Sequence, residues 1–459
     1  MSNPSNGATQ LLDRYAQEYR DRTPKSSALY EKARARLPGG AGRNATMFWP
    51  NPIYADHGEG AYLIDIDDNC YVDLSLDGGS CILGHASPEM VAACQEQLTR
   101  GSLLAMATEA EVRLAERLNA QMPFLEMIRF LNTGSEPEQI ALRIARAFTG
   151  REKFARVEGH HHGQSDFMLH SHIGETAGPD LAPETVSDDP GVPASLSQYV
   201  ITIPFNETEA AVSIIEQNAD DLACVIIEPM MMWGGSLPAQ QEYLDAIRDV
   251  TQRLGILMIV DEIPLGVRFG PAGAIGEYNI APDMWTTGKA LFGGIAHGML
   301  GGRADVFEKV VAPPYDPAIK VFCSGTFSAN PMAMTAAHIV LDAMEDGSAV
   351  EYMDALTQRL GNGLLSLAEE YELPFQFTGK HSVFAIHLTD RELRTFRDVK
   401  AGPQGLRKAF YTGLMARGIL WPPGRPTGTL STAHTEADID TILEASDSVL
   451  KDIKKAWDD

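Results

Sequence analysis

Basic residues, cysteine and long apolar runs are all scarce in this 459-residue sequence. Lys and Arg number 37 against 62 Asp and Glu, which gives a formal net charge of −25. Because this surplus of negative charge repels polyanions, we expect neither nucleic acid nor an anionic membrane surface as a partner. The 5 cysteines are scattered and form no CxxC pair. This pattern is typical of a reduced, cytoplasmic protein rather than of a disulfide framework.

Targeting and membrane signals are also missing from the sequence pattern. The N-terminal stretch MSNPSNGATQLLDRYAQEYRD is polar and contains no apolar signal region. No run reaches the roughly 18 apolar residues of a membrane helix. Hydrophobic residues nevertheless make up 44 % of the chain, enough for a sizeable core. We therefore expect a soluble cytoplasmic protein with one large α/β unit and a smaller appended domain.

Short apolar strands alternate with longer helical stretches between about residues 87 and 320. The expected strands are MIRFLNT (127–133), ACVIIEP (223–229), LMIVDE (257–262) and DMWTT (283–287). This alternation predicts an α/β fold with a mostly parallel central sheet covered by helices on both faces. We assign residues 1–75 to an N-terminal segment of the small domain, 76–330 to the large domain and 331–459 to a C-terminal small domain.

Two further patterns concern the smaller domain. Residues 61–76 alternate apolar and polar side chains around Asp68-Asn69, which predicts a β-hairpin. After Pro331 come helical segments, a β-like stretch, SVFAIHLTD (382–390), and a final helix from about residue 436.

Ligands of open α/β sheets bind at the carboxyl ends of the strands, and the first conspicuous end is NTGSEPEQIALRIARAF (132–148). Ser135 and Glu138 form the S-x-x-E pattern of a capping box, and Pro137 fits the first helical turn. Gly134 at the helix start leaves N–H groups free to hold a phosphate. The alternative is a well-capped helix without a ligand.

Two further strand ends carry charged residues. LMIVDE ends in Asp261 and Glu262, and buried carboxylates need a partner such as a helix start, an ion pair or a cationic cofactor nitrogen. Lys289 in WTTGKALFGG (285–294) follows the strand DMWTT and lies among small and apolar residues. A desolvated lysine loses its proton more easily and can form a Schiff base. The alternative is a solvated loop lysine.

The segment EGHHHGQSD (158–166) contains three adjacent histidines, which at first suggest a metal. Successive residues of an extended segment point to opposite sides, and no Cys/His pair at a useful spacing lies nearby, so we predict no metal site. The other three strand ends offer a phosphate cradle, a carboxylate for a ring nitrogen and a Schiff-base lysine. Together they match the phosphate, pyridinium nitrogen and aldehyde of pyridoxal 5′-phosphate (PLP).

These motifs resemble those of class III (subgroup II) PLP-dependent aminotransferases of fold type I. The branch is similar to glutamate-1-semialdehyde aminomutase, D-phenylglycine aminotransferase and β-phenylalanine aminotransferase. The likeness runs from LPGG (37–40) to STAHTEADID (431–440) and includes NTGSEP (132–137), HHG (161–163) and IIEP. The resemblance implies that the large domain binds PLP through Thr133, Gly134, Ser135, His161, Glu228, Asp261 and Lys289.

The resemblance also implies a role for individual residues. Gly134 and Ser135 would bind the phosphate, and His161 would stack on the pyridine ring. The catalytic residues would be Lys289, which forms the Schiff base, and Asp261, which faces the pyridine nitrogen.

Further motifs of the resemblance concern assembly and substrate. SGTFSANP (324–331) matches G-T-F-x-x-N-P, whose Thr326 would reach the phosphate of a neighbouring subunit, so a homodimer with shared active sites is implied. Arg43 in PGGAGRN and Arg425 in PPGRPTGTLS lie where β-phenylalanine aminotransferases carry carboxylate-binding arginines. Guanidinium forks suit carboxylate or phosphonate groups. The alternative is two surface arginines.

Some residues depart from the family pattern around the substrate pocket. DEIPLGVR (261–268) has Pro264 and Leu265 where smaller or polar residues are usual. His161 replaces Tyr or Trp, Pro137 replaces Ala, and Ala296 replaces Pro. These changes leave the expected cofactor site intact and bear mainly on the substrate.

The predicted function is transfer of the amino group of an acid-bearing amine, a β- or ω-amino acid, to a keto acid. Two alternatives on the same fold stay open: an ammonia-lyase acting on a hydroxy-aminoalkylphosphonate, and an aminomutase. The expected partners are thus a small-molecule amine and, for transamination, a keto acid. A non-catalytic regulator is disfavoured by the intact lysine, aspartate and glycine set.

Overall fold

The chain divides into two compact units in the computed structural model, which describes residues 5–172, 174–310, 320–424 and 426–458. Unit 1 comprises Met1–Pro88, Glu351–Glu392 and Asp398–Asp459, and unit 2 comprises Glu89–Val350 and Leu393–Arg397. Unit 2 ends beyond the predicted boundary at residue 330. The reason is that helix α11 (Pro331–Met344) packs against α5 (Glu109–Gln121) and the turn η5 (Lys289–Phe292), which belong to unit 2.

The described part of unit 2 contains a seven-stranded sheet in the order β4-β12-β11-β10-β7-β5-β6. Only β12 runs antiparallel to its two neighbours within this sheet, and the remaining pairs are parallel. The mostly parallel α/β fold is therefore confirmed. The strands are β4 (Met127–Leu131), β5 (Lys153–Val157), β6 (Val200–Ile203), β7 (Leu222–Ile227), β10 (Leu257–Glu262), β11 (Met284–Gly288) and β12 (Gly298–Gly302).

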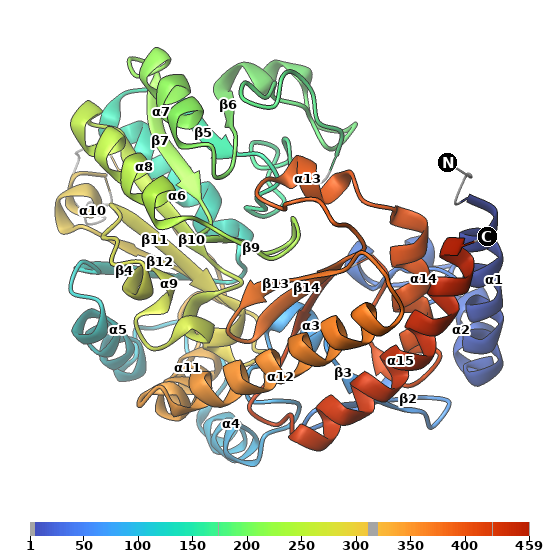
Figure 1. Cartoon of the computed structure of the whole chain (residues 1–459). Helices are drawn as coiled ribbons and strands as arrows, with labels where there is room; N and C mark the ends of the chain where they lie inside the picture. The colour runs from blue at the N-terminus through green and yellow to red at the C-terminus, as the bar shows by residue number, and fades with distance from the viewer. Residues whose placement is uncertain (1–4, 173, 311–319, 425, 459) are drawn as a thin grey trace. The chain divides into compact units, whose positions relative to one another are not determined.

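The central strands are buried on both faces, as their continuous apolar sequences predict. Every residue of β7, β10 and β11 is buried. Helices including α6 (Ser135–Thr149), α7 (Thr208–Gln217) and α8 (Gln241–Leu254) pack on these strands or on each other (Figure 1). Ile140 and Ile144 of α6 enter the core and Phe148 packs against it, so the predicted apolar face of this helix is confirmed.

Unit 1 contains two small sheets and its own core. The predicted hairpin is β2 (Tyr62–Asp65) and β3 (Cys70–Asp73), which pair antiparallel. They belong to a sheet of order β1-β2-β3-β15, and a second sheet has the order β13-β14-β16. The other strands are β1 (Ala55–Glu59), β13 (Gln376–Lys380), β14 (Val383–His387), β15 (Ile419–Leu420) and β16 (Thr427–Thr429).

Helices complete the core of unit 1. Both α1 (Ser5–Arg22) and α15 (Glu436–Asp458) pack against α14 (Gln404–Met415) and against each other. The final helix begins at the residue that the sequence predicts.

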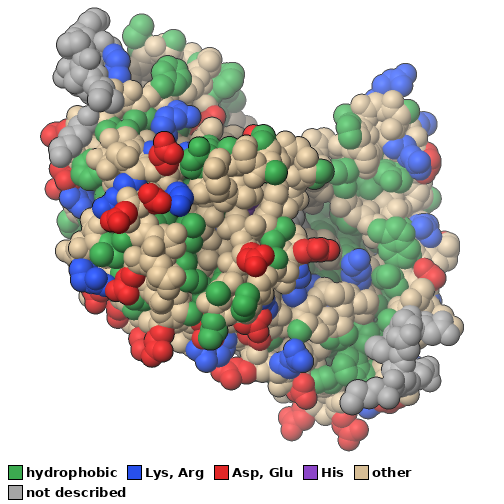
Figure 2. Space-filling model, turned by 90° about the horizontal axis from the view of Figure 1, so that it is seen from above, with side chains coloured by type: hydrophobic (Ala, Val, Ile, Leu, Met, Phe, Trp, Pro, Cys, Tyr) green, Lys and Arg blue, Asp and Glu red, His purple; other side chains and the backbone are tan. Residues whose placement is uncertain are grey.

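The surface carries charges of both signs. Figure 2 shows acidic and basic side chains interspersed on one face of the molecule. Among the residues described, no helix combines the length and the apolar character that a membrane crossing requires.

Candidate functional site

Four of the predicted site residues lie in or after adjacent parallel strands of unit 2. Lys289 follows β11, Asp261 lies in β10, Glu228 follows β7, and His161 follows β5. These strands are direct neighbours in the order β11-β10-β7-β5. Because all four run parallel, their carboxyl ends meet at one edge of the sheet, where ligands of such sheets bind.

Asp261 is buried and is held by two contacts on its two oxygens. Oδ2 lies 2.8 Å from Nδ1 of His162, and Oδ1 accepts the backbone N–H of Ile263 at 2.8 Å. Burial raises the pKa of Asp261 to about 7, although the Ile263 N–H, the charge of Lys289 and the Thr286 hydroxyl oppose this shift. The folded chain alone therefore stabilises the Asp261 carboxylate incompletely.

Glu262, the next residue, has a different role. Its carboxylate accepts the backbone N–H groups of Ala274 at 2.8 Å and Ile275 at 2.7 Å. These donors belong to the short helix α9 (Gly273–Glu277). Of the two acids that end the strand, Glu262 secures a helix start, and Asp261 is the one placed with the other site residues.

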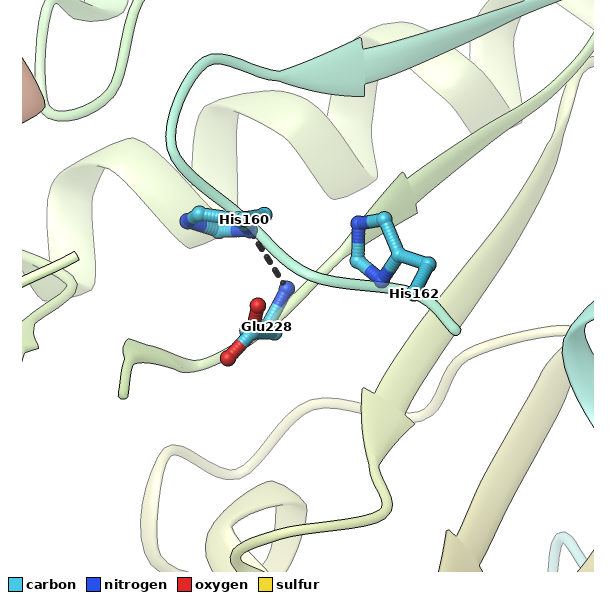
Figure 3. A group of neighbouring side chains, drawn as sticks. All are labelled: His160, His162 and Glu228. Atoms are coloured by element: carbon cyan, nitrogen blue, oxygen red, sulfur yellow. Dashed lines mark hydrogen bonds between the residues drawn. The ribbon is translucent and has the colours of Figure 1, made fainter. Parts of the chain in front are cut away.

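Glu228 braces the loop that carries the histidines. Its carboxylate accepts the backbone N–H of His161 at 2.6 Å and that of Met232 at 3.3 Å. Its own backbone N–H donates to Nδ1 of His160 at 2.9 Å (Figure 3). Burial, followed by the nearby Asp261, raises the pKa of Glu228. Glu228 thus fixes the position of His161 through the backbone.

Lys289 adopts a backbone conformation that a lysine rarely occupies. Its φ is 40°, in the left-handed region that costs a non-glycine residue about 1–2 kcal/mol. The side chain is partly buried, and Nζ lies 5.0 Å from the centre of the Trp233 ring. The charge of Lys289 lowers the pKa of both Asp261 and Glu228 against the effect of burial. Lys289 is thus a positive charge that acts on both carboxyls.

The expected phosphate cradle is the turn between β4 and α6. Helix α6 begins at Ser135, with Gly134 as the preceding cap residue. The Ser135 hydroxyl accepts the backbone N–H of Gln164 at 3.1 Å, so its own hydrogen is available to an anion. Gly163 has a φ of 90°, and a Cβ there would lie 2.6 Å from Ser135 Oγ. Only glycine therefore lets the histidine loop approach the helix start this closely.

The predicted capping box is wrong. Helix α6 has no side-chain cap at its first position. Instead, Glu136 reaches back to accept the backbone N–H of Asn132 at 2.7 Å. Glu138, the presumed capping acid, is completely buried and accepts the hydroxyl of Thr286. Thr133, in the same turn, is exposed.

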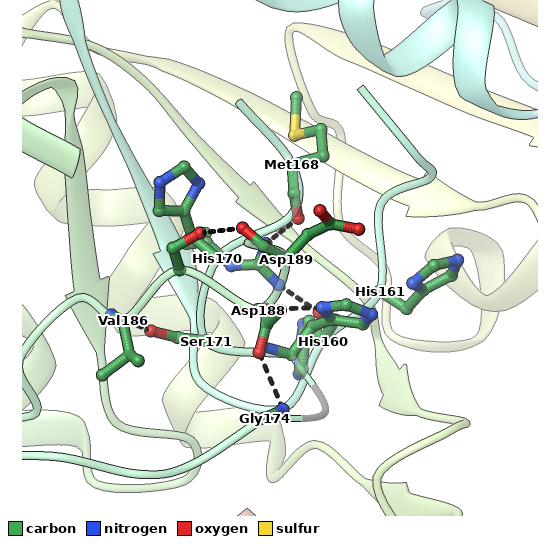
Figure 4. Close-up of polar contacts among 12 residues, drawn as sticks. His160, His161, Met168, His170, Ser171, Gly174, Val186, Asp188 and Asp189 are labelled. Atoms are coloured by element: carbon green, nitrogen blue, oxygen red, sulfur yellow. Dashed lines mark hydrogen bonds and ion pairs between the residues drawn. The ribbon is translucent and has the colours of Figure 1, made fainter. Parts of the chain in front are cut away.

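The ring of His161 lies next to the ring of a second histidine, His172. Its ring centre is 4.9 Å from that of His172, with an angle of 36° between the planes. His172 Nδ1 lies 2.6 Å from Oδ2 of Asp188, and Asp188 also accepts the backbone N–H of Gly174 at 2.7 Å (Figure 4). Burial, then the charges of His172 and Lys289, keeps the pKa of His161 well below its usual value. His161 is therefore a neutral ring at physiological pH.

The other two histidines, His160 and His162, lie close to each other and to Glu228 (Figure 3). Their ring centres are 5.9 Å apart, and ligand atoms of His160, His162 and Glu228 lie within 4.8 Å of one another. The segment therefore does bring potential ligand atoms together, and the absence of a metal site stays a prediction. However, His160 Nδ1 already accepts the Glu228 N–H at 2.9 Å, and His162 Nδ1 is engaged by Asp261 at 2.8 Å.

The residues at this edge fit PLP. The Asp261 carboxylate suits a cationic ring nitrogen, the Lys289 amine suits an aldehyde, and the helix start at Ser135 suits a phosphate. Gly134 adds a steric reason, since a Cβ there would lie 2.7 Å from a side-chain carbon of Ile263. A larger residue would therefore disturb the cradle.

Three predicted residues, Arg43, Arg425 and Thr326, remain to be located. Arg43, in unit 1, makes a two-pronged ion pair with Asp77, with Nη1 at 3.2 Å from Oδ2. Both side chains are largely exposed. Arg425 lies outside the described residues. Thr326 is exposed in a turn that precedes α11.

Two residues of the site escaped the sequence reasoning. His162 is the direct partner of Asp261, and the alternation of an extended segment could have found it: when His161 faces one way, His162 faces the other. Glu138 was assigned to the capping box because it matches that local pattern. Its spacing gives no indication that the acid is buried.

Comparisons with known proteins cover almost the whole chain. Residues 45–441 match the family described as aminotransferase class-III. A glutamate-1-semialdehyde 2,1-aminomutase from Methanothermobacter thermautotrophicus is 36 % identical over 431 residues, which cover 94 % of this chain and 100 % of that protein.

Solved structures agree with this assignment. A transaminase solved with PLP bound is 30 % identical, with a TM-score of 0.85, and the match covers 94 % of this chain and 98 % of that one. A β-phenylalanine aminotransferase from Variovorax paradoxus is 29 % identical, with a TM-score of 0.85 and coverage of 96 % and 97 %. The predicted resemblance is confirmed, and the chain belongs to the class-III aminotransferase family.

Proposed function

We propose that the strand-end cluster binds PLP and that the protein moves amino groups on small, carboxylate-bearing amines. Membership of the family and the PLP-bound transaminase support PLP as the cofactor. The observation that carries the proposal is the row of Lys289, Asp261, Glu228 and His161 across adjacent strand ends. When bound, PLP supplies an aldehyde that joins an amine and a cationic ring that accepts the electron pair left by a departing proton.

The contacts of the side chains support the following proposed catalytic roles. Lys289 Nζ would hold the cofactor covalently and, once displaced by the substrate amine, would take a proton from carbon and return it to a neighbouring atom. Asp261 would accept the ring N–H, and its orientation is held by His162 and by the Ile263 N–H. A negative charge at this place keeps the ring nitrogen protonated.

The remaining contacts would hold the cofactor in place. The turn of Thr133, Gly134 and Ser135 would bind the phosphate through N–H and hydroxyl donors. His161 would pack on the ring face as a neutral aromatic group. Glu228 would act indirectly, because its carboxylate holds the backbone of His161.

Among the reactions open to such a site, we place the aminomutase first. The 36 % identity to an aminomutase over 94 % of the chain supports it. An aminomutase moves an amino group within one molecule, so the reaction needs no external acceptor. The test is incubation with glutamate-1-semialdehyde alone, followed by chromatography for the isomer whose amino group has moved from C2 to C1. No conversion by a PLP-loaded protein would contradict this assignment.

Transamination of a β- or ω-amino acid is the second candidate. The transaminase and the β-phenylalanine aminotransferase among the similar structures favour it. Here activity requires a keto acid and yields its amino acid in equal amount. The ammonia-lyase alternative is separated in the same assay, because a hydroxy-aminoalkylphosphonate would release free ammonia without any acceptor.

Attachment of the cofactor at Lys289 is tested independently of the substrate. Borohydride treatment of the PLP-loaded protein followed by peptide mass spectrometry should find the label on Lys289. Lys289→Ala should lower turnover by at least about 1000-fold. A protein that is colourless and indifferent to PLP would refute the proposed function.

The substrate anion is assigned to Arg43 and Arg425 by resemblance. Removing a charge-assisted hydrogen bond to the substrate costs about 2–4 kcal/mol, or roughly 30- to 1000-fold in kcat/KM. Arg43→Ala and Arg425→Ala should therefore impair acid-bearing amines far more than neutral amines such as 1-phenylethylamine. In the described structure Arg43 is paired with Asp77, so that ion pair would have to open. Equal losses for both classes of amine would exclude these arginines from substrate recognition.

The assembly that we propose is a cytoplasmic homodimer in which Thr326 completes a neighbour's phosphate site. Several apolar side chains of unit 2 are exposed in the single chain, among them Met106 at 80 %, Phe322 at 74 % and Phe327 at 59 %. An interface would cover such side chains, since contiguous exposed apolar patches are typical of interfaces. Sedimentation of an active monomer would contradict this assembly.

A further inference from the structure

A completely buried carboxyl group, that of Glu138, lies close to Asp261, the residue predicted to face the ring nitrogen of the cofactor. Glu138 belongs to helix α6 and has no exposed surface. The hydroxyl of Thr286 donates to Oε1. The other oxygen, Oε2, has no hydrogen-bond partner within the described parts of the chain. A buried carboxyl that lacks half of its partners costs stability, so its presence calls for a function.

The neighbours of Glu138 are the two residues that form the ring-nitrogen site. A carboxyl oxygen of Glu138, a ring nitrogen of His162 and a carboxyl oxygen of Asp261 all lie within 4.8 Å of one another. His162 also has an unused polar atom, because its Nε2 is buried without a partner in the described structure. Two unsatisfied polar atoms therefore belong to side chains of the same small cluster.

The protonation states of the two groups are complementary. His162 gives its Nδ1 hydrogen to Asp261, which leaves a lone pair on Nε2. Burial, and then the charges of Asp261 and Glu228, raises the pKa of Glu138 well above its usual value. A neutral Glu138 has one O–H to donate, and Nε2 of His162 is the acceptor that lacks a donor. Because ligand atoms of the two side chains lie within 4.8 Å of each other, a rearrangement of the side chains or one bridging water would allow this hydrogen bond.

A metal ion is the competing explanation for three ligand atoms so close together. It would draw on the same Asp261 carboxylate that the pyridinium nitrogen requires, and two cations would then share one site. A hydrogen bond between Glu138 and His162 needs no such conflict. It would also fix the tautomer of His162 that donates to Asp261.

We propose that Glu138 is a positioning residue, which acts on the cofactor's ring nitrogen through His162 and Asp261. As a neutral acid it donates to His162, and His162 then holds the Asp261 carboxylate oriented toward the ring. This inference rests on the proposed function, because it requires PLP at Asp261. It assigns a role to an acid that neither the cofactor motifs nor the resemblance include.

The test compares two substitutions of similar size. Glu138→Gln keeps a donor group, whereas Glu138→Met has none. We expect kcat of the Gln variant to stay within about 3-fold of wild type and that of the Met variant to fall about 10-fold or more, with KM of the amine little changed. The decisive readout is the ¹⁵N shift of the ring nitrogen of labelled PLP, which should change in the Met variant only.

A second measurement does not depend on the folding of the Met variant. A neutral Glu138 in the wild-type protein should give a protonated-carboxyl infrared band that is missing from Glu138→Gln. Absence of this band, or a Met variant with wild-type kcat and ring-nitrogen shift, would overturn the inference. Wild-type protein that binds no PLP would overturn the proposed function as well, and its absorbance separates that outcome from the others.

Discussion

Two buried aspartates at neighbouring strands differ in role: we assign a structural role to Asp283 and a role in cofactor binding to Asp261. Asp283 immediately precedes β11, and Asp261 lies near the end of β10. Asp283 is bonded to Arg248 at 2.7 Å and Arg303 at 2.5 Å, and it accepts the backbone N–H of Met258 at 2.8 Å. Asp261 is bonded instead to the ring of His162 and to a backbone N–H.

The difference lies in the source of the counter-charge. Two guanidinium groups of the chain itself compensate the charge of Asp283. This carboxylate therefore needs no further counter-charge once the protein has folded. Burial without equal compensation raises the pKa of Asp261 to about 7, and a pyridinium nitrogen would restore the balance. Since β10 and β11 run parallel, Asp261 lies at the ligand-binding edge of the sheet and Asp283 at the opposite edge.

Substitution by asparagine should lower enzyme activity strongly at Asp261 and only slightly at Asp283. Asp261→Asn removes the charge that keeps the ring nitrogen protonated, so we expect kcat to fall about 100- to 1000-fold while PLP still binds through its phosphate. Asp283→Asn should leave kcat of the folded, PLP-loaded protein within about 3-fold, because Asp283 lies at the opposite edge. Steady-state kinetics with titrated active sites measures both, and near wild-type activity of Asp261→Asn would refute the assignment.

The same substitutions should rank in the reverse order by stability. Asp283→Asn leaves two arginines without their shared carboxylate, and we expect a loss of about 2–3 kcal/mol in the free energy of unfolding, reduced from a fully buried pair because Arg303 is partly exposed. Asp261→Asn should cause no such loss in the PLP-free protein at pH 8, where the Asp261 carboxylate is not compensated. Urea unfolding of the PLP-free forms provides the comparison. A larger loss at Asp261 would show that it, too, is mainly structural.

The fold and the row of site residues could be predicted because both depend on local patterns. Continuous apolar strands such as LMIVDE predict burial on both faces, and parallel strands bring their carboxyl ends together whatever the details of packing. Lys289 and Asp261 could therefore be placed at one edge from their positions after strands. The direction of His161 and His162 could also have been derived from the alternation of extended chain.

Other features could not be predicted because they depend on tertiary contacts. The match of Ser135 and Glu138 to a capping box is a local pattern, but the core accepts Glu138 because Thr286 of a distant strand supplies a hydrogen bond. Likewise, His172 and Asp188 support His161 from a loop whose sequence carries no motif. Such contacts need coordinates, since no spacing rule connects the residues.

The pH dependence of stability offers a smaller and more specific test. An aspartate whose pKa is raised on folding binds its proton more tightly in the native state, so stability falls as pH rises from about 4 through the raised value near 7. Asp261→Asn removes this contribution. At pH 8 the PLP-free variant should therefore be more stable than the PLP-free wild type, by about 1–2 kcal/mol.

Melting temperatures of both PLP-free proteins at pH 5 and pH 8 measure this effect. Some slope should persist in the variant, because burial also raises the pKa of Glu262, to about 8. Addition of PLP should reverse the order at pH 8, since the cationic ring nitrogen compensates only the wild-type carboxylate. Equal slopes for the two PLP-free proteins would show that Asp261 is already compensated by the chain.

The smallest expected effect concerns His161. In contrast to the two aspartates, this residue would act through the shape of its ring and not through a charge. Burial and the neighbouring charges of His172 and Lys289 hold the pKa of His161 well below its usual value, so it would contribute an aromatic face and no charge. His161→Phe keeps such a face, and we expect kcat/KM and PLP affinity to change by less than about 1 kcal/mol, or roughly 5-fold. His161→Ala, the matched control, removes the ring and should weaken PLP binding by about 0.5–1.5 kcal/mol.

Titration of PLP-free protein gives the affinities, and the pH profile of the Phe variant between pH 6 and 9 should match that of wild type. A 100-fold loss of kcat in the Phe variant would show that His161 transfers protons, and the site would then hold a second acid–base group beside Lys289.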